Sequence, residues 1–129
     1  MNWEKRRLTN SHYQEILNDL IDKIPKGKYD AVYGIPRGGC IPATWISYQL
    51  DIHLMTEYGF YIPAEKVLIA DDICDTGITF EPFIEAGYDT ACLFWKPRAT
   101  VKPTYYVHET ELWVVFPYEK DEEPINRER

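Results

Sequence analysis

The sequence predicts an α/β protein in which a mostly parallel, twisted sheet carries helices on its faces. Strand-length apolar runs alternate along the chain with segments of helical periodicity. One run, Val67–Ala70, has four consecutive apolar residues, which is typical of a central parallel strand covered on both sides. The 129 residues contain no repeat and no linker, so we expect a single domain over residues 1–129.

The first half of the chain alternates helix and strand. Apolar residues at helical spacing predict a helix over 11–24 that opens on a capping box of Ser11 and Gln14. Pro25 ends it. After it we expect a strand over 30–35, a turn over 36–39, a helix over 41–50 and a strand over 52–56.

The second half continues the alternation and supplies most of the sheet. Strands are expected over 67–70, 90–95, 105–108 and 112–116, with a short helix over 79–86. The charged tail from Glu119 onward is predicted to be frayed. Strands that alternate with helices favour parallel pairing through crossover connections.

Charge and hydropathy exclude several function classes. The net charge of −7 disfavours nucleic acid, because an acidic surface repels phosphate backbones. The basic run Lys5-Arg6-Arg7 is interpreted as a solvated helix end or a frayed terminus. The chain has no run of about 18 apolar residues, so the sequence predicts no membrane-spanning helix. No apolar stretch follows the basic residues near the start, so we expect no standard secretory signal. We therefore expect a cytoplasmic protein whose three separated cysteines are reduced thiols.

A polar loop follows the apolar run 67–70 and is the most informative segment of the chain. Asp71 and Asp72 come first, and Asp75-Thr76-Gly77-Ile78-Thr79 precedes the predicted helix. Backbone amides of 76–79 can form a cradle for a phosphate, since Gly77 permits close approach. The two acids suit ribose hydroxyls or a magnesium ion. An ordinary turn remains the alternative for Asp-Thr-Gly alone, but the full string is more specific.

This string resembles the phosphoribosyl-pyrophosphate signature of the type I phosphoribosyltransferases. Residues 33–39 resemble the family's pyrophosphate loop, and residues 94–97 resemble the lysine segment that reads 6-oxopurines. Residues 112–119 resemble the aromatic segment that stacks on the base. The order and spacing are close to those of the bacterial xanthine-guanine enzymes. The resemblance implies the family fold, with a small C-terminal hood or base-binding element.

The resemblance also implies a role for each matched residue. Asp75 is the candidate catalytic base near purine N7. Asp75, Thr76, Gly77, Ile78 and Thr79 are implied to bind the 5′-phosphate. The implied ribose and metal residues are Asp71 and Asp72, with Asp72 at the metal, and the implied pyrophosphate residues are Arg37, Gly38 and Gly39. Lys96, Trp113 and Val114 are implied to bind the base.

The implied reaction transfers a phosphoribosyl group from phosphoribosyl pyrophosphate to guanine, xanthine or hypoxanthine, with Mg²⁺ as cofactor. Related enzymes can carry a cis peptide in the pyrophosphate loop, so the Pro36–Arg37 bond is expected to be cis. A homo-oligomer, either dimer or tetramer, is also implied. The interval 56–66 is too short for the family's usual mobile hood. A non-catalytic nucleotide-binding or phosphoribosyl-pyrophosphate-binding regulatory module is therefore the main alternative, and an interaction protein on the same fold is a weaker one.

Overall fold

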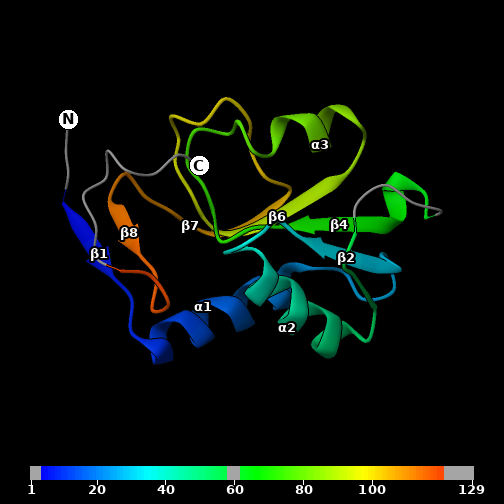
Figure 1. The fold of residues 1–129 in the computed structure, drawn as a ribbon, viewed down its shortest axis with the longest axis horizontal. Helices are drawn as coiled ribbons and strands as arrows, with labels where there is room; N and C mark the ends of the chain where they lie inside the picture. The colour runs from blue at the N-terminus through cyan, green and yellow to red at the C-terminus, as the bar shows by residue number, and fades with distance from the viewer. Residues whose placement is uncertain (1–3, 58–61, 121–129) are drawn as a thin grey trace.

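The computed structural model describes residues 4–57 and 62–120, and within them it has a main parallel sheet and a separate small one (Figure 1). The helices are α1 (Asn10–Lys23), α2 (Cys40–Leu50) and α3 (Glu81–Glu85), with a 3₁₀ turn η1 (Ala64–Lys66). The strands are β1 (Lys5–Arg7), β2 (Ala31–Gly34), β3 (His53–Met55), β4 (Val67–Ala70), β5 (Ile73–Cys74), β6 (Asp89–Trp95), β7 (Tyr105–Glu109) and β8 (Trp113–Val115).

The main sheet is parallel throughout, as predicted. Its order runs β3, β2, β4 and β6, with β7 on the other edge of β6. The short strand β5 pairs with the end of β6, so it continues the line of β4 after a break at Asp71 and Asp72. Since all strands point the same way, the loops that leave them meet at one edge of the sheet.

Helices cover both faces of this sheet, which confirms the predicted α/β architecture. In Figure 1, α1 and α2 lie on one side of it and α3 on the other. Leu68 and Ala70 pack into the core beneath α1 and α2, whereas Val67 and Ile69 pack into the core on the α3 side. Burial on both faces explains why β4 is an unbroken apolar run rather than an alternating one.

Two helix boundaries differ from the prediction. The N-cap of α1 is Thr9, whose side chain accepts a hydrogen bond from the His12 amide at 3.1 Å, so the capping box of Ser11 and Gln14 is wrong. The helix expected over 79–86 is the single turn α3, because residues 78–80 form a turn before it.

The basic run Lys5–Arg7 is not a helix end or a frayed terminus. It forms β1, which pairs in parallel with β8 in the small sheet. The Trp113 amide donates to the carbonyl of Glu4 at 2.8 Å, and the Leu8 amide donates to the carbonyl of Val115 at 3.0 Å. The predicted C-terminal base-binding element is therefore built from both ends of the described chain.

Two predictions fall partly outside the described residues. The short hood interval 56–66 includes residues 58–61, and most of the charged tail lies beyond Lys120. The described end of the interval forms η1 and leads directly into β4. Within the ranges 4–57 and 62–120, no helix has the length and apolar character needed to cross a membrane.

Candidate active site

The loop after β2 packs tightly against the neighbouring strand end. The Ile35 amide donates to the carbonyl of Ala70 at 2.9 Å, and the Gly39 amide donates back to the carbonyl of Ile35 at 2.8 Å. The Pro36–Arg37 peptide bond is cis, as expected from the sequence. Arg37 is exposed at the tip of this loop, where its guanidinium is accessible to an anion.

Gly38 lies directly on the carboxylate of Asp72. A methyl group added to Gly38 would overlap the Oδ2 and Cγ atoms of Asp72. Asp72 itself is fully buried. The loop after β2 and the acidic pair after β4 therefore form one unit, and only a glycine fits between them.

The same carboxylate is held from the other side by Tyr118. The Tyr118 hydroxyl donates to Asp72 Oδ2 at 2.6 Å. Partial burial, followed by the negative charge of Asp72, raises the pKa of Tyr118, so the phenol keeps the proton that it donates. The Tyr118 ring also stacks on Phe116, with centroids 5.6 Å apart. This contact ties the segment after β8 to the acidic pair.

Asp71 is also buried, and its Oδ1 atom accepts the amide of Asp72 at 2.8 Å. The structure thus brings both acids to the edge that was predicted for a ribose or a metal. No group of three or more His, Cys, Asp or Glu side chains in the described part of the chain is arranged to hold a metal ion. A metal here would take ligands from elsewhere as well.

The signature loop turns sharply at Gly77, which has a φ of +91°. A second loop braces it from outside. The Thr100 amide donates to the carbonyl of Thr76 at 2.9 Å, and the Thr100 hydroxyl donates to Glu81 Oε1 at 2.7 Å. Ile78 is exposed at the tip, and its amide donates to the Thr76 hydroxyl at 3.3 Å. Thr79 is half-buried just before α3.

Asp75 is the centre of a charge cluster. Its buried carboxylate lies 3.5 Å, through Oδ1, from the ammonium of Lys96, which is also buried. The same oxygen accepts from Arg98 through Nε at 2.9 Å and through Nη2. Two cations from the loop after β6 therefore converge on one atom of the predicted catalytic base.

Lys96 connects this cluster to the small sheet. Its Nζ atom lies 5.4 Å from the centre of the Trp113 ring, within the range of a cation–π contact. Trp113 and Val114 are both buried in β8. Lys96 therefore contacts the carboxylate of Asp75 in the signature loop and the ring of Trp113 in β8. The three residues come from three separate segments of the chain.

Cys74, in β5 just before the signature loop, is held as a buried thiol. Cys74 is buried, and burial raises the pKa of its thiol to about 12, so it is a thiol at neutral pH. This agrees with the interpretation of the cysteines as ordinary reduced thiols. The three cysteines are all free.

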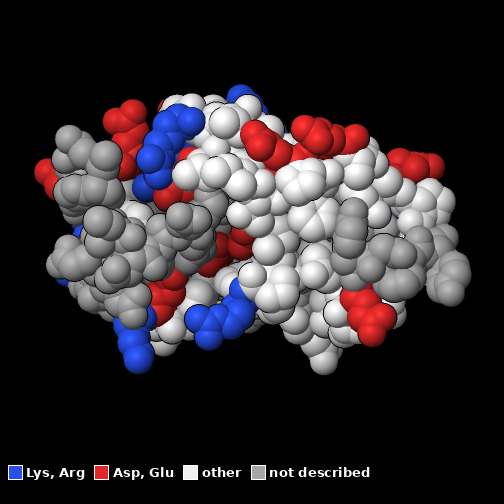
Figure 2. Space-filling model, turned by 45° about the horizontal axis from the view of Figure 1, so that its top comes forward, with Lys and Arg blue, Asp and Glu red and all other residues white. Residues whose placement is uncertain are grey.

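The charge distribution leaves anion binding to local donors. The face that Figure 2 shows carries acidic side chains along its edges and in a hollow near its centre, with fewer basic ones. Since the net charge is −7, attraction by the whole molecule does not favour an anionic ligand. Phosphates would have to be held by loop amides, Arg37 and a cation.

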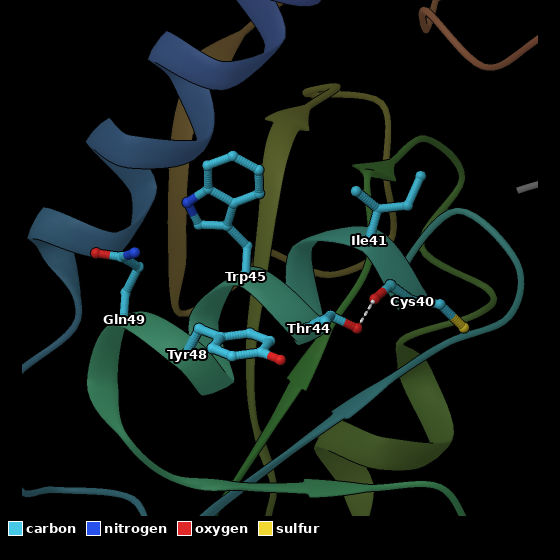
Figure 3. Close-up of a pocket in the computed structure, with 6 residues that line it drawn as sticks. All are labelled: Cys40, Ile41, Thr44, Trp45, Tyr48 and Gln49. Atoms are coloured by element: carbon cyan, nitrogen blue, oxygen red, sulfur yellow. Dashed lines mark hydrogen bonds between the residues drawn. The ribbon is translucent and has the colours of Figure 1, made fainter.

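A hollow along α2 is lined by residues other than those of the charge cluster around Asp75 (Figure 3). It has a volume of about 640 Å³ and is mostly apolar. Its lining residues are Cys40, Ile41, Thr44, Trp45, Tyr48 and Gln49. None of these residues was predicted to bind a ligand.

Comparison with known proteins identifies the family. The chain is 34% identical to a purine phosphoribosyltransferase from Pyrococcus horikoshii Ot3 whose crystal structure is known. The match covers 92% of this chain and 97% of that one, with a TM-score of 0.80. The chain belongs to the type I phosphoribosyltransferase family. No family model matches it.

Other relatives agree with this assignment. A xanthine-guanine phosphoribosyltransferase from Nitratidesulfovibrio vulgaris is 29% identical over 122 residues, covering 76% of this chain and 74% of that protein. The corresponding enzyme from Desulfotalea psychrophila is 28% identical, with 76% and 75% covered. A Helicobacter pylori xanthine-guanine-hypoxanthine phosphoribosyltransferase shares the fold at a TM-score of 0.78, with 16% identity and coverage of 92% and 96%.

Within this phosphoribosyltransferase, the predicted residues gather at one edge of the sheet, but their roles remain predictions. Three further residues were not predicted: Arg98, Thr100 and Tyr118. Arg98 stands two positions after Lys96, and that second cation at the same strand end was the available signal. Tyr118 lies in the aromatic segment 112–119 that resembles the base-stacking segment, but its contact with Asp72 was not predicted, because that contact depends on how the small sheet docks.

The acidic pair fits the magnesium ion that the family implies. Mg²⁺ prefers oxygen ligands and is usually held by one or two carboxylates together with substrate phosphates and water. Asp71 and Asp72 would supply those carboxylates.

Proposed function

We propose that this chain transfers a phosphoribosyl group from phosphoribosyl pyrophosphate to a 6-oxopurine, giving a nucleoside 5′-monophosphate and pyrophosphate. The observation that carries the proposal is the position of Lys96, in contact with both Asp75 and the ring of Trp113. A site that only bound phosphate would not need a buried cation beside an aromatic ring.

The base-binding side accounts for the preference for an oxo group. A purine stacked on Trp113 would bring its 6-position toward Lys96. An ammonium group only donates hydrogen bonds, so it suits the carbonyl of guanine, xanthine or hypoxanthine and not the amino group of adenine. The backbone carbonyl of Val114 would accept from an exocyclic amino group. All three 6-oxopurines would present the same carbonyl to Lys96.

Asp75 would handle the proton of the base. A 6-oxopurine with its proton on N7 has a free lone pair on N9, which attacks the anomeric carbon. The N9–C1′ bond forms, the C1′–oxygen bond to pyrophosphate breaks, and the N7 proton passes to the Asp75 carboxylate. The positive charge that builds on the base and the ribose in the transition state lies beside the same carboxylate.

The remaining residues would hold the phosphates and the sugar. Backbone amides of Thr76, Gly77, Ile78 and Thr79 would surround the 5′-phosphate, with Asp75 opening the loop. Arg37 and the amides of Gly38 and Gly39 would bind the leaving pyrophosphate. Asp71 and Asp72 would accept from ribose hydroxyls and hold magnesium, with Asp72 at the metal. When bound, magnesium would offset negative charge on the leaving group.

One assay tests this function against the main alternative. Purified protein is mixed with magnesium, phosphoribosyl pyrophosphate and each purine, and released pyrophosphate is measured. We expect turnover with at least one 6-oxopurine and none with adenine. Asp75→Asn should lower kcat about 10²- to 10⁴-fold, the usual contribution of a general base, while GMP binding is largely kept. GMP binding without turnover on any base would favour the non-catalytic regulatory module instead.

A further inference from the structure

We infer that Arg98 is a positioning residue for Asp75: it holds Oδ1 of the carboxylate so that Oδ2 faces the purine while Lys96 binds the base. The inference rests on the proposed function, because it assigns Asp75 to the purine side of the site.

The geometry separates the two cations that meet at Asp75. Arg98 donates to Oδ1 through two nitrogens of one guanidinium, with Nε at 2.9 Å, whereas the Lys96 ammonium lies at 3.5 Å. The first is a hydrogen bond and the second is longer than one. Two N–H groups of the planar guanidinium converge on Oδ1, so they hold that oxygen more firmly than the single ammonium at 3.5 Å does.

This arrangement gives the two cations different roles, with Arg98 on Asp75 and Lys96 toward the base. With Arg98 on Oδ1, Asp75 keeps a cationic partner after Lys96 turns toward the base. Both Oδ1 contacts come from the loop after β6, and the structure gives Oδ2 of Asp75 no partner among the described residues. Oδ2 is therefore the oxygen left for a proton of the purine.

The loop that carries Arg98 is itself held in place. The Ala99 amide donates to the carbonyl of Lys96 at 2.9 Å, and the Thr100 amide donates to the carbonyl of Thr76 at 2.9 Å. The Arg98 side chain is 58% exposed, while the carboxylate that it contacts is 6% exposed. A surface arginine thus reaches inward from an anchored backbone, which limits the positions that its guanidinium can take.

The test compares Arg98→Gln with Lys102→Gln. Lys102 is an exposed cation of the same connection whose ammonium lies over Trp95 and Tyr106, so its removal changes the net charge equally. We expect Arg98→Gln to lower kcat about ten- to a hundredfold, the range for losing a hydrogen bond to a charged group. The KM for the purine should rise as Lys96 moves onto Asp75, while the KM for phosphoribosyl pyrophosphate stays unchanged. Arg98→Lys should restore only part of kcat.

A binding measurement separates positioning from chemistry. 9-Deazaguanine carries an N–H at position 7 and a carbon at position 9, so it can donate to Asp75 but cannot react. Titration calorimetry with the full chain, magnesium and phosphoribosyl pyrophosphate should show about tenfold weaker binding for Arg98→Gln, and none of that loss for Lys102→Gln.

The outcomes separate a failure of this inference from a failure of the proposed function on which it rests. If the wild-type protein turns over and Arg98→Gln matches Lys102→Gln in kcat, in both KM values and in 9-deazaguanine affinity, Arg98 does not position Asp75 and the inference alone falls. A loss confined to the KM for phosphoribosyl pyrophosphate would likewise overturn it. If the wild-type protein neither turns over nor binds 9-deazaguanine, both the function and the inference fall.

Discussion

At the scale of single residues, the signature loop has a left-handed backbone conformation and a close contact with a second loop, both at Gly77. Its φ of +91° is left-handed, and a methyl group there would lie 2.6 Å from the Thr100 hydroxyl oxygen and 2.9 Å from the Thr100 nitrogen. Gly77→Ala should therefore push apart the signature loop and the loop around Thr100 that braces it. We expect weaker phosphoribosyl-pyrophosphate binding and lower stability, measured by calorimetry and urea unfolding.

Gly27→Ala is the matched control for this substitution. Gly27 also has a positive φ, +80°, but an added methyl group would meet nothing within 4 Å. The left-handed conformation alone costs an alanine about 1–2 kcal/mol. Both variants should lose that much stability, and only Gly77→Ala should lose more and also lose ligand. Equal behaviour of the two variants would mean that the contact with Thr100 has no role in the site.

The predicted site residues lie in short sequence motifs, whereas the residues that were missed are identified only by contacts between distant parts of the chain. Asp75, Lys96 and Trp113 stand in recognisable strings, so each could be proposed before the fold was known. Arg98 and Tyr118 make their contacts over 23 and 46 positions of the chain, and no local pattern records such pairs. Their roles follow only from the register in which the loops meet at the sheet edge.

At the scale of elements, the same distinction separates β4 from β1. The four apolar residues of β4 predict a strand because both of its faces are buried. The Lys-Arg-Arg sequence of β1 has no such pattern, and its pairing with β8 joins the two ends of the described chain. β5 was missed for another reason, since two residues are too few to show any periodicity.

The position of β1 predicts that it supports base binding. Arg6 lies opposite Val114, one residue from the predicted stacking Trp113. Arg6→Pro removes an amide from the small sheet and should loosen β8. We expect the KM for the purine to rise about two- to tenfold, as for the loss of one hydrogen bond, with an unchanged KM for phosphoribosyl pyrophosphate in steady-state kinetics.

Arg6→Thr is the control for the side chain. The Arg6 guanidinium lies over the Phe94 ring at 5.1 Å, and both substitutions remove that contact. Only the proline removes the amide, while threonine is well suited to a strand. A purine KM that rises equally in both variants would assign the effect to the contact with Phe94 and not to the pairing of β1 with β8.

At the scale of the whole molecule, the burial of tyrosine and cysteine side chains makes the free energy of unfolding depend on pH in the alkaline range. Burial raises the pKa of Tyr29 and Tyr13, and it raises those of Cys74 and Cys92. The unfolded chain loses these protons at ordinary values, near pH 9 for thiols and near pH 10 for phenols, whereas the folded chain keeps them. The unfolded state then binds fewer protons, so the free energy of unfolding falls as pH rises above about 9.

Tyr29 offers the sharpest test of this linkage. It is 3% exposed, its hydroxyl donates to Asp89 Oδ2 at 2.5 Å, and it lies 2.7 Å from the Tyr105 hydroxyl. Each proton retained only by the folded state contributes a slope of about 1.4 kcal/mol per pH unit. Tyr29→Phe should therefore be less stable than wild type at about pH 8, through lost hydrogen bonds, yet lose stability less steeply above about pH 10. Urea unfolding at steps between about pH 8 and 11 measures both effects, with the exposed Tyr48→Phe as control. An unchanged slope in Tyr29→Phe would mean that its phenol ionises equally readily in the folded and unfolded protein.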